Sequence, residues 1–354
     1  MYFSLLNHCI LVFGAEKGVI YNLKERKAIE LEKEECGLVA YAEKGNALSD
    51  GMEKSDTLLR LAKIGWGFFS ERRYFIDKIR PYNHFTLTRP DLAPENPQIA
   101  YLQLNHRCRL GAKECGKRFC TPCRCTDVGT DVLALEQWID IAERLYHAGV
   151  REFILTGGDV LEYEGLPRLC DYMQRLGVMP VLIVNHADER LRVIDKDIPL
   201  IIYLCADKQS ADEIKAATGE FEHVTVLSDS GFPSGSALLT GGKIRSVQVK
   251  NMAVIDKNDF LIPGVAEFYQ RKDRDLCLLG KVFVKSNADV VPCFQMGGNK
   301  VGNLLDDSVR AIIHSLSEKY WKGNTPKDAG CISCEWFYAC PVCKGMSAEK
   351  VCPL

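Results

Sequence analysis

The chain has 354 residues, of which 47% are hydrophobic and 26% charged, and its formal net charge is −2. This composition is typical of a globular protein with room for two or three domains, and it excludes extensive disorder. The nearly neutral charge gives no general attraction to nucleic acid or to an anionic membrane, so we expect neither partner. No apolar run reaches the ~20 residues of a membrane helix, and Met1–Phe13 lacks the basic start and cleavage site of a signal peptide. These features predict a cytoplasmic protein.

Sixteen cysteines are the unusual part of the composition. Thiols in a reducing cytoplasm rarely form structural disulfides, so a dense cysteine pattern there indicates metal or redox chemistry. Four of them stand singly in apolar surroundings, and we expect them to be small buried core residues: Cys9, Cys36, Cys170 and Cys205. The other twelve fall into two groups.

The first ninety residues predict a small α+β domain. Strand and helix patterns alternate with polar breaks, and Phe85–Pro97, with three prolines, reads as a linker. The expected strands are Cys9–Phe13, Gly18–Leu23 and Ala28–Leu31, and the expected helices are Glu32–Ala42 and Asp56–Lys63.

From Gln98 onward, strands and helices alternate along the chain. Repeated βα units with continuous apolar strands predict a parallel sheet with helices outside it. About 180 residues precede Cys277 in this region, fewer than the ~250 of a complete eightfold barrel, so we expect an open, partial barrel that binds ligands at the carboxyl ends of its strands. The expected strands are Gln98–Leu104, Glu152–Thr156, Pro180–Val184, Leu200–Leu204 and Val224–Leu227. The expected helices are Asp131–Ala148, Leu166–Leu176, Asp188–Ile194 and Ala211–Ala217.

The first cysteine group directly follows the first strand of this region. Cys120-x2-Cys123 can place two thiolates on one metal centre, and the third ligand would be Cys108, anchored at the end of the strand, or Cys115 in the loop. Cys125 is too close to Cys123 to join the same centre easily. Iron–sulfur clusters and zinc both accept thiolates at such spacings, which do not distinguish them.

The position of this group distinguishes the two readings. A cysteine loop after the first strand of a βα barrel, followed by a Gly-Gly-acid turn after the second, resembles the radical S-adenosylmethionine (SAM) superfamily. In that family a C-x3-C-x2-C loop holds a [4Fe–4S] cluster by three thiolates, and the open iron binds the amino and carboxylate groups of SAM. The resemblance assigns Cys120, Cys123 and either Cys108 or Cys115 as ligands. The spacing departs from the family, with eleven residues between Cys108 and Cys120 and four between Cys115 and Cys120.

Two further turns fit the same family. Gly157-Gly158-Asp159 looks like its GGE turn, in which backbone groups meet the amino group of SAM, although a Gly-Gly after a strand is often only a tight turn. Asn185 matches the asparagine that ends the family's third strand, and Asp207 stands where it often has Ser-x-Asp. The resemblance implies that Gly157, Gly158, Asp159 and Asn185 bind SAM.

The second cysteine group is the most specific feature of the chain. It resembles the SPASM extension of radical SAM enzymes and consists of Cys277, Cys293, Cys331, Cys334, Cys340, Cys343 and Cys352. By this resemblance, Cys331, Cys334, Cys340 and Cys352 hold one auxiliary [4Fe–4S] cluster, and Cys277, Cys293 and Cys343 another. A zinc ribbon is the alternative, because C-x2-C pairs also suit tetrahedral zinc.

Two segments near the second cysteine group strengthen the likeness. Asn287–Cys293 looks like the DGDVYPC hairpin of that family, with Ala288 in place of the turn glycine. Gly302-Asn303-Leu304 resembles the GNI that opens the next helix.

The expected fold is therefore α/β, with three domains. Residues 1–92 form a small α+β domain, which is either a winged-helix module for a leader peptide or a structural cap. Residues 93–270 form a partial (β/α)6-type radical SAM barrel, and residues 271–354 the cysteine-rich SPASM iron–sulfur domain. This layout is most similar to the grasp-with-spasm peptide maturases.

The resemblance implies a radical SAM enzyme that modifies a ribosomally synthesised precursor peptide, which it recognises through the leader. Its cofactors would be SAM, one SAM-binding [4Fe–4S] cluster and one or two auxiliary clusters, reduced by a flavodoxin or ferredoxin. Cleavage of SAM would give a 5′-deoxyadenosyl radical that abstracts hydrogen from the peptide, leading to a thioether or carbon–carbon crosslink or an oxidised residue. The alternatives are a dehydrogenase like the anaerobic sulfatase maturases, or a non-catalytic Fe–S or zinc protein with a degenerate SAM site. No general acid or base is assigned.

Overall fold

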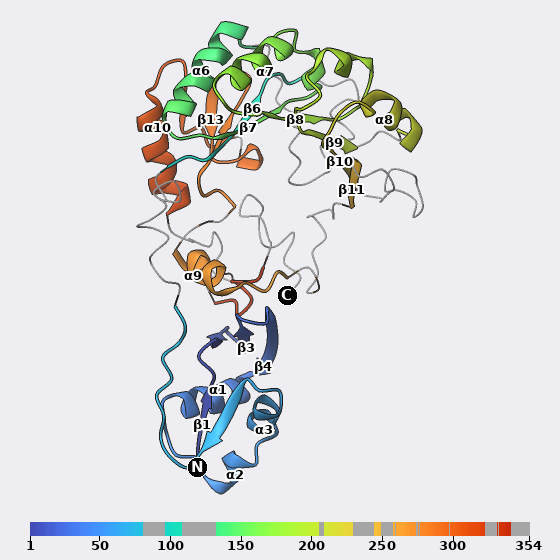
Figure 1. The fold of residues 1–354 in the computed structure, drawn as a ribbon. Helices are drawn as coiled ribbons and strands as arrows, with labels where there is room; N and C mark the ends of the chain where they lie inside the picture. Colours follow the sequence, from blue (N-terminus) through green and yellow to red (C-terminus); the bar gives the residue numbers. More distant parts are fainter. Residues whose placement is uncertain are drawn as a thin grey trace. The chain divides into compact units, whose positions relative to one another are not determined.

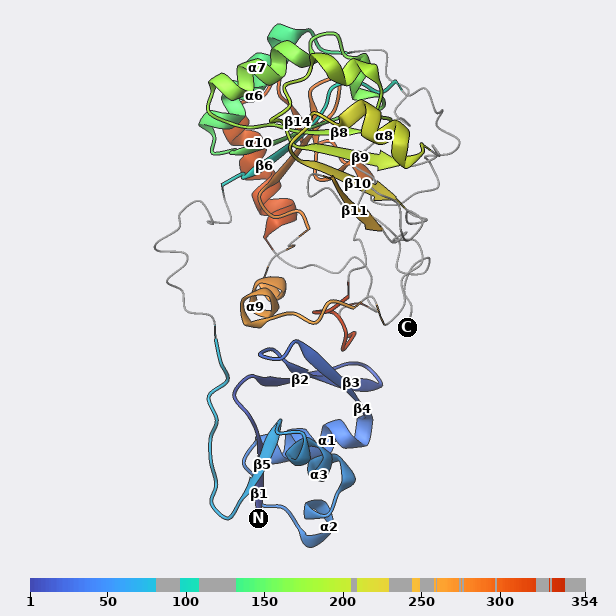
Figure 2. The same ribbon diagram turned by 45° about the vertical axis from the view of Figure 1, so that its right-hand side comes forward.

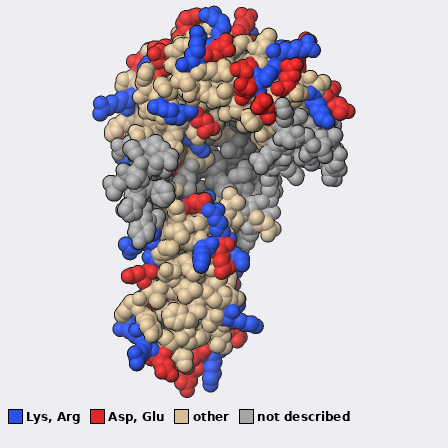
Figure 3. Space-filling view, viewed as in Figure 1, with Lys and Arg blue, Asp and Glu red and all other residues tan. Residues whose placement is uncertain are grey.

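The computed structural model describes residues 1–80, 96–107, 132–204, 209–228, 244–248, 258, 260–273, 275, 277–296, 298–322, 331 and 333–340. The chain divides into two compact units (Figure 1). The smaller unit comprises Met1–His84, Ile255–Leu276 and Gly323–Leu354, and the larger comprises Phe85–Val254 and Cys277–Lys322. On the face drawn in Figure 3, Lys and Arg side chains are interspersed with Asp and Glu. Within the described ranges, no helix is both long and apolar enough to cross a bilayer.

The larger unit is built on a nine-stranded sheet with the order β11-β10-β9-β8-β7-β6-β12-β13-β14. The seven strands from β11 to β12 are parallel, and β13 and β14 extend the edge in antiparallel fashion. Because strands β6 to β11 lie side by side in chain order, the sheet winds as an open βα barrel does. The mostly parallel α/β sheet predicted from the sequence is confirmed. The strands are β6 (Ile99–Gln103), β7 (Glu152–Thr156), β8 (Val181–Val184), β9 (Leu200–Leu204), β10 (Val224–Ser228), β11 (Ile244–Gln248), β12 (Lys281–Val284), β13 (Asp289–Val291) and β14 (Gly302–Asn303).

Helices cover one face of this sheet, as Figure 2 shows for α6, α7 and α8. They are amphipathic, and their apolar stripes are buried: in α6, Leu135, Trp138, Ile141 and Leu145 point into the core, with Trp138 fully buried. A smaller cluster of Ile154, Ile183 and Tyr203 occupies the opposite face. The helices are α6 (Leu135–His147), α7 (Leu166–Arg175), α8 (Ala211–Thr218) and α10 (Val309–Leu316), with short turns η2 (Val160–Glu162), η3 (Glu189–Val193), η6 (Phe294–Met296) and η7 (Ser317–Trp321).

One segment of the larger unit was wrongly predicted to be an α-helix. The segment Asp188–Ile194, predicted as a helix, is the 3₁₀ helix η3, capped by the Asp188 carboxylate, which accepts a hydrogen bond from Arg190 N. With only five residues before the chain turns extended at Ile194, too few i to i+4 bonds can form for a regular α-helix.

A hairpin joins β12 and β13 and confirms the turn expected around Asn287–Cys293. Ala288 has a φ of +67°, in the left-handed region that favours glycine, which agrees with its place at a turn-glycine position. The helix expected to open at Gly302 begins instead at Val309. Gly302 pairs with β13 as part of β14, and the Ser308 hydroxyl caps α10 by accepting from Ala311 N at 3.2 Å.

The smaller unit contains two sheets and a separate core. Strands β1 (Tyr2–Leu5) and β5 (Gly67–Ser70) pair antiparallel, and β2 (Cys9–Phe13), β3 (Lys17–Asn22) and β4 (Lys27–Glu32) form a meander. Helices α1 (Lys33–Glu43), α2 (Asp50–Glu53) and α3 (Asp56–Lys63) follow, and α9 (Val265–Asp273) belongs to the same unit. The core is formed by residues such as Phe3, Leu31, Val39, Leu58 and Trp66.

The single cysteines behave as predicted where the structure describes them. Cys9, Cys36 and Cys170 are each at most 2% exposed. Burial raises the pKa of Cys9 and Cys170 to about 12 and that of Cys36 to about 11, so these thiols stay protonated near neutral pH. Cys205 lies outside the described residues.

Candidate functional site

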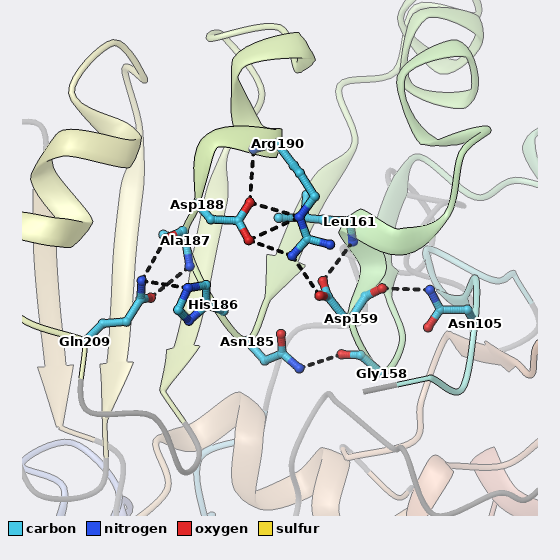
Figure 4. A network of polar contacts seen from close by, with 10 residues as sticks. All are labelled: Asn105, Gly158, Asp159, Leu161, Asn185, His186, Ala187, Asp188, Arg190 and Gln209. Carbon is cyan, nitrogen blue, oxygen red and sulfur yellow. Dashed lines mark hydrogen bonds and ion pairs between the residues drawn. The ribbon is translucent and has the colours of Figure 1, made fainter. Parts of the chain in front are cut away.

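Three segments meet at the carboxyl ends of β6, β7 and β8 (Figure 4). The side chain of Asn105, two residues beyond β6, donates to the Asp159 carbonyl oxygen at 2.7 Å, and Gly158 N donates to the Asn105 carbonyl at 3.1 Å. Asn185, directly after β8, donates its side-chain amide to the Gly158 carbonyl at 2.8 Å. Asn105 and Asn185 are each only 3% exposed, so these bonds lie in a water-poor place where they fix backbone geometry firmly. The two asparagines hold the Gly-Gly-Asp turn from both sides.

The glycines of this turn are required by close backbone packing. A Cβ on Gly157 would lie 2.8 Å from the Asn105 carbonyl oxygen, and one on Gly158 would collide with the Arg107 carbonyl. Neither glycine has a positive φ, so the constraint is space and not conformation. Arg107 is the last described residue before the cysteine loop. The turn therefore packs directly against the strand extension that leads into that loop.

Asp159 is held by a buried ion pair. The residue is only 1% exposed. Its carboxylate accepts a hydrogen bond from Leu161 N at 3.2 Å, at the start of η2, and pairs with Arg190 Nη2 at 2.8 Å. Arg190 also binds Asp188 at 2.6 Å, so one guanidinium joins the ends of β7 and β8. Burial would raise the pKa of Asp188, but hydrogen bonds from Arg190 outweigh it and the pKa lies below its ordinary value. The hydrogen bond to Asp188, and to a lesser extent that to Asp159, raises the pKa of Arg190, so its guanidinium stays charged.

A second small network lies beside the end of β8. The Gln209 side chain accepts from Ala187 N at 2.8 Å and donates to the Ala187 carbonyl at 2.7 Å. The same amide nitrogen lies 3.2 Å from His186 Nε2. Gln209 thus ties the segment after β8 to the start of α8, which follows β9 (Figure 4).

Two buried polar atoms at this edge suit the charged groups of a bound amino acid. Within the described residues, Asn105 Oδ1 and Arg190 Nη1 are buried without a hydrogen-bond partner. An unpaired buried polar atom costs about 1–3 kcal/mol, so a ligand that pairs with it gains affinity. A carbonyl oxygen can accept from an ammonium group, and a guanidinium nitrogen can donate to a carboxylate. The methionine part of SAM carries both groups, so the residues present fit it.

The structure describes only part of the expected site. Gly157, Gly158, Asp159 and Asn185 are brought together as above, and their binding of SAM stays a prediction. Six of the expected metal ligands lie outside the described residues: Cys108, Cys115, Cys120, Cys123, Cys343 and Cys352. Cys125 and Asp207 lie there too.

The remaining cysteines of the second group fall in both units. Cys277 is exposed, and half-buried Cys293 packs against Phe283 beside β13, both in the larger unit. Cys331, Cys334 and Cys340 are half-buried in the smaller unit. The described part of the chain contains no group of three or more His, Cys, Asp or Glu placed to share a metal ion.

Sequence reasoning missed several residues of the network, among them Asn105, Arg190 and Gln209. Asn105 stood directly before the cysteine loop, and its place at a strand end was a usable signal. Arg190 and Gln209 gave no signal, because a charged or amide residue in a short helix or loop is ordinarily solvent-facing.

Comparison with known proteins gives matches in structure only. No protein-family model matches the chain, and no curated protein matches it in sequence. It is similar to Streptococcus suis SuiB bound to S-adenosylmethionine, at 14% identity and a TM-score of 0.42, over 96% of this chain and 94% of that one. SuiB bound to precursor peptide SuiA matches at 12% identity and a TM-score of 0.42 over the same shares. The protein anSMEcpe with bound AdoMet matches at 12% identity and a TM-score of 0.41, over 69% of this chain and 85% of that one.

These matches bear on the family resemblance. Two of these three structures hold SAM, as their names state, and the family resemblance of this chain itself rests on the motifs. At such identities and TM-scores the superposition carries no argument about activity. The activity has to be argued from the motifs and from the strand-end geometry.

Proposed function

We propose that the protein is a radical SAM enzyme that modifies a ribosomally synthesised precursor peptide. The observation that carries this proposal is the convergence at one sheet edge of the Gly157-Gly158-Asp159 turn, the strand extension leading into the cysteine loop, and Asn185. A parallel sheet binds its ligands at this edge, and among the described residues Asn105 Oδ1 and Arg190 Nη1 are buried there without a hydrogen-bond partner. The seven cysteines of the second group support the assignment to the SPASM type.

The residues of the network have distinct proposed roles. Asn105 and Asn185 would fix the turn backbone, and Asn105 Oδ1 with the Gly157 carbonyl would accept hydrogen bonds from the ammonium group of SAM. Arg190 would neutralise Asp159 and offer Nη1 to the SAM carboxylate. A [4Fe–4S] cluster on Cys120, Cys123 and either Cys108 or Cys115, with its bound SAM, would supply hydrogen-abstracting power when reduced by a flavodoxin or ferredoxin. The barrel would exclude water and present the peptide C–H bond.

The peptide substrate is the finer part of the proposal. SPASM cysteines and a separate small α+β unit are typical of enzymes that hold a leader peptide while modifying the core peptide. The product would be a thioether or carbon–carbon crosslink, or an oxidised residue. The auxiliary clusters proposed for the second cysteine group would accept an electron from the product radical.

Metal analysis tests this proposal first. Anaerobically purified protein should contain roughly eight to twelve iron atoms and matching acid-labile sulfide per chain, the content of two or three four-iron clusters. Reduced protein with SAM should form 5′-deoxyadenosine, and Cys120→Ala should abolish its formation. One or two zinc atoms without sulfide would instead indicate closed thiolate sites.

A second candidate is a non-catalytic Fe–S or zinc protein, favoured by the eleven residues between Cys108 and Cys120. Equilibrium binding of SAM to the anaerobic protein separates the two, because a degenerate site would not bind it. A dehydrogenase like the sulfatase maturases would use the same clusters, and it differs in acting on a protein without a leader.

A further inference from the structure

The cysteine segment of the smaller unit is held by residues far away in the sequence. Residues 333–340 form turns and no regular helix or strand, so their carbonyls are not paired in a regular helical or strand pattern of hydrogen bonds. Four carbonyls accept hydrogen bonds from outside the segment. Ser333 O accepts from Ala15 N at 2.9 Å, Glu335 O from Tyr21 Oη at 2.7 Å, Tyr338 O from Arg271 Nη1 at 2.8 Å, and Ala339 O from Leu261 N at 3.0 Å.

Tyr21 is the central contact between the β2–β4 meander and this cysteine segment. It lies on β3, which pairs with β2 on one side and β4 on the other, so its backbone is fixed. The side chain is fully buried. Its ring lies 6.2 Å from that of Trp336, 6.3 Å from Tyr338 and 5.7 Å from Phe268 of α9, in tilted or edge-to-face arrangements.

The neighbouring strands add two contacts to the same segment. Trp336 Nε1 donates to the Glu30 carboxylate on β4 at 3.1 Å. At the β2–β3 turn, a Cβ on Gly14 would collide with the Glu335 carboxylate, which shows how closely the turn backbone approaches. All three strands of the meander or their turns therefore contact residues 333–336, which include Cys334 and precede Cys340.

We infer that the β2–β4 meander is the scaffold that fixes the C-terminal cysteine segment, with Tyr21 as its positioning residue. By holding the Glu335 carbonyl, Tyr21 sets the backbone next to Cys334 and so the direction of that thiol. Residues 1–80 of the smaller unit then have a role besides the leader recognition proposed above, and their deletion would remove the support of the cysteine segment as well. The effect on a cluster rests on the proposed function, whereas the effect on the thiols does not.

Two measurements on the full-length chain test this inference. In the metal-free chain, we expect Tyr21→Phe to raise the alkylation rates of Cys334 and Cys340 by iodoacetamide about fivefold, the scale of one lost hydrogen bond, as followed by mass spectrometry. In the iron-loaded chain carrying Cys120→Ala and Cys123→Ala, we expect Tyr21→Phe to release iron to a chelator about fivefold faster. The phenylalanine keeps the ring contacts, so the unit should remain folded.

Tyr41→Phe is the matched control. Tyr41 lies in the same unit and its hydroxyl also donates to a backbone carbonyl, that of Ala47 at 3.4 Å, which is outside residues 333–340. It should change neither rate. Equal rates in the wild type, Tyr21→Phe and Tyr21→Ala would overturn the positioning role.

A separate variant tests the cluster itself. If Cys331→Ala leaves the iron content of the Cys120→Ala, Cys123→Ala chain unchanged, the proposed auxiliary cluster is wrong. The alkylation rates still decide the role of Tyr21 in that case.

Discussion

The pair formed by Arg190 and Asp159 permits a quantitative prediction. Replacing Arg190 with methionine removes the guanidinium that pairs with the buried Asp159 carboxylate at 2.8 Å, while the hydrogen bond from Leu161 N to that carboxylate stays. Breaking a buried ion pair from one side costs about 3–5 kcal/mol. The Arg190 side chain is 24% exposed, so solvent weakens the pair, and we expect a loss near the lower end, about 3 kcal/mol in the free energy of unfolding of the larger unit.

A double-mutant cycle separates the pair from its surroundings. Asp159→Asn keeps the cap of η2 and removes the buried charge. The double variant Asp159→Asn, Arg190→Met should therefore lose only about 1.5 kcal/mol of the wild-type free energy of unfolding. Arg192→Met, on the same turn but exposed, should change stability by less than about 0.5 kcal/mol.

The assay must follow the larger unit alone, because a chain with two units need not unfold in one step. Hydrogen exchange with mass spectrometry on peptides covering residues 152–166 reports local opening there. Because the pKa of Asp188 is lowered in the folded chain, the stabilisation from its pairing is present above the ordinary pKa of about 4 and lost as the pH falls below it. The difference in free energy of unfolding between wild type and Arg190→Met should therefore become smaller as the pH falls below about 4. A loss below about 1 kcal/mol for Arg190→Met, or additive losses in the cycle, would refute the reasoning.

Three more variants and one chemical treatment have defined outcomes. Gly158→Ala should destabilise the larger unit by at least about 2 kcal/mol in chemical denaturation, because the methyl group meets a backbone carbonyl, whereas Gly37→Ala in α1, with open space around it, should stabilise its unit by about 0.5–1 kcal/mol. Ala288→Gly should stay within about 0.5 kcal/mol of wild type in the same assay, since relief of its left-handed conformation offsets the loss of a buried methyl of about 0.8 kcal/mol. In metal-free protein at pH 8, iodoacetamide should modify exposed Cys277 and spare Cys170, whose pKa is raised to about 12. Labelling of both at similar rates would contradict that assignment.

Local pattern was sufficient for several regular elements of both units, whereas strands β11 and β12 of the large sheet were not predicted. The strands at Glu152–Thr156 and Leu200–Leu204 were predicted with their observed bounds, and so was the helix Asp56–Lys63. Each carries its own periodicity and ends at turn residues or a cap. Burial of Cys9, Cys36 and Cys170 also followed from apolar neighbours, because the neighbours of a residue on a buried face are themselves buried.

The sequence by itself also determined which chemistry to look for, since cysteine spacings and the Gly157-Gly158 turn are local features. Only the tertiary structure decided what depends on distant pairing. Strands β1 and β5 are four residues each and pair across more than sixty residues, so neither has a local signal. The contact of Tyr21 with Glu335 joins residues 314 apart, and Arg190 meets Asp159 across 31. Such contacts depend on the packing of whole elements, which no window of sequence contains.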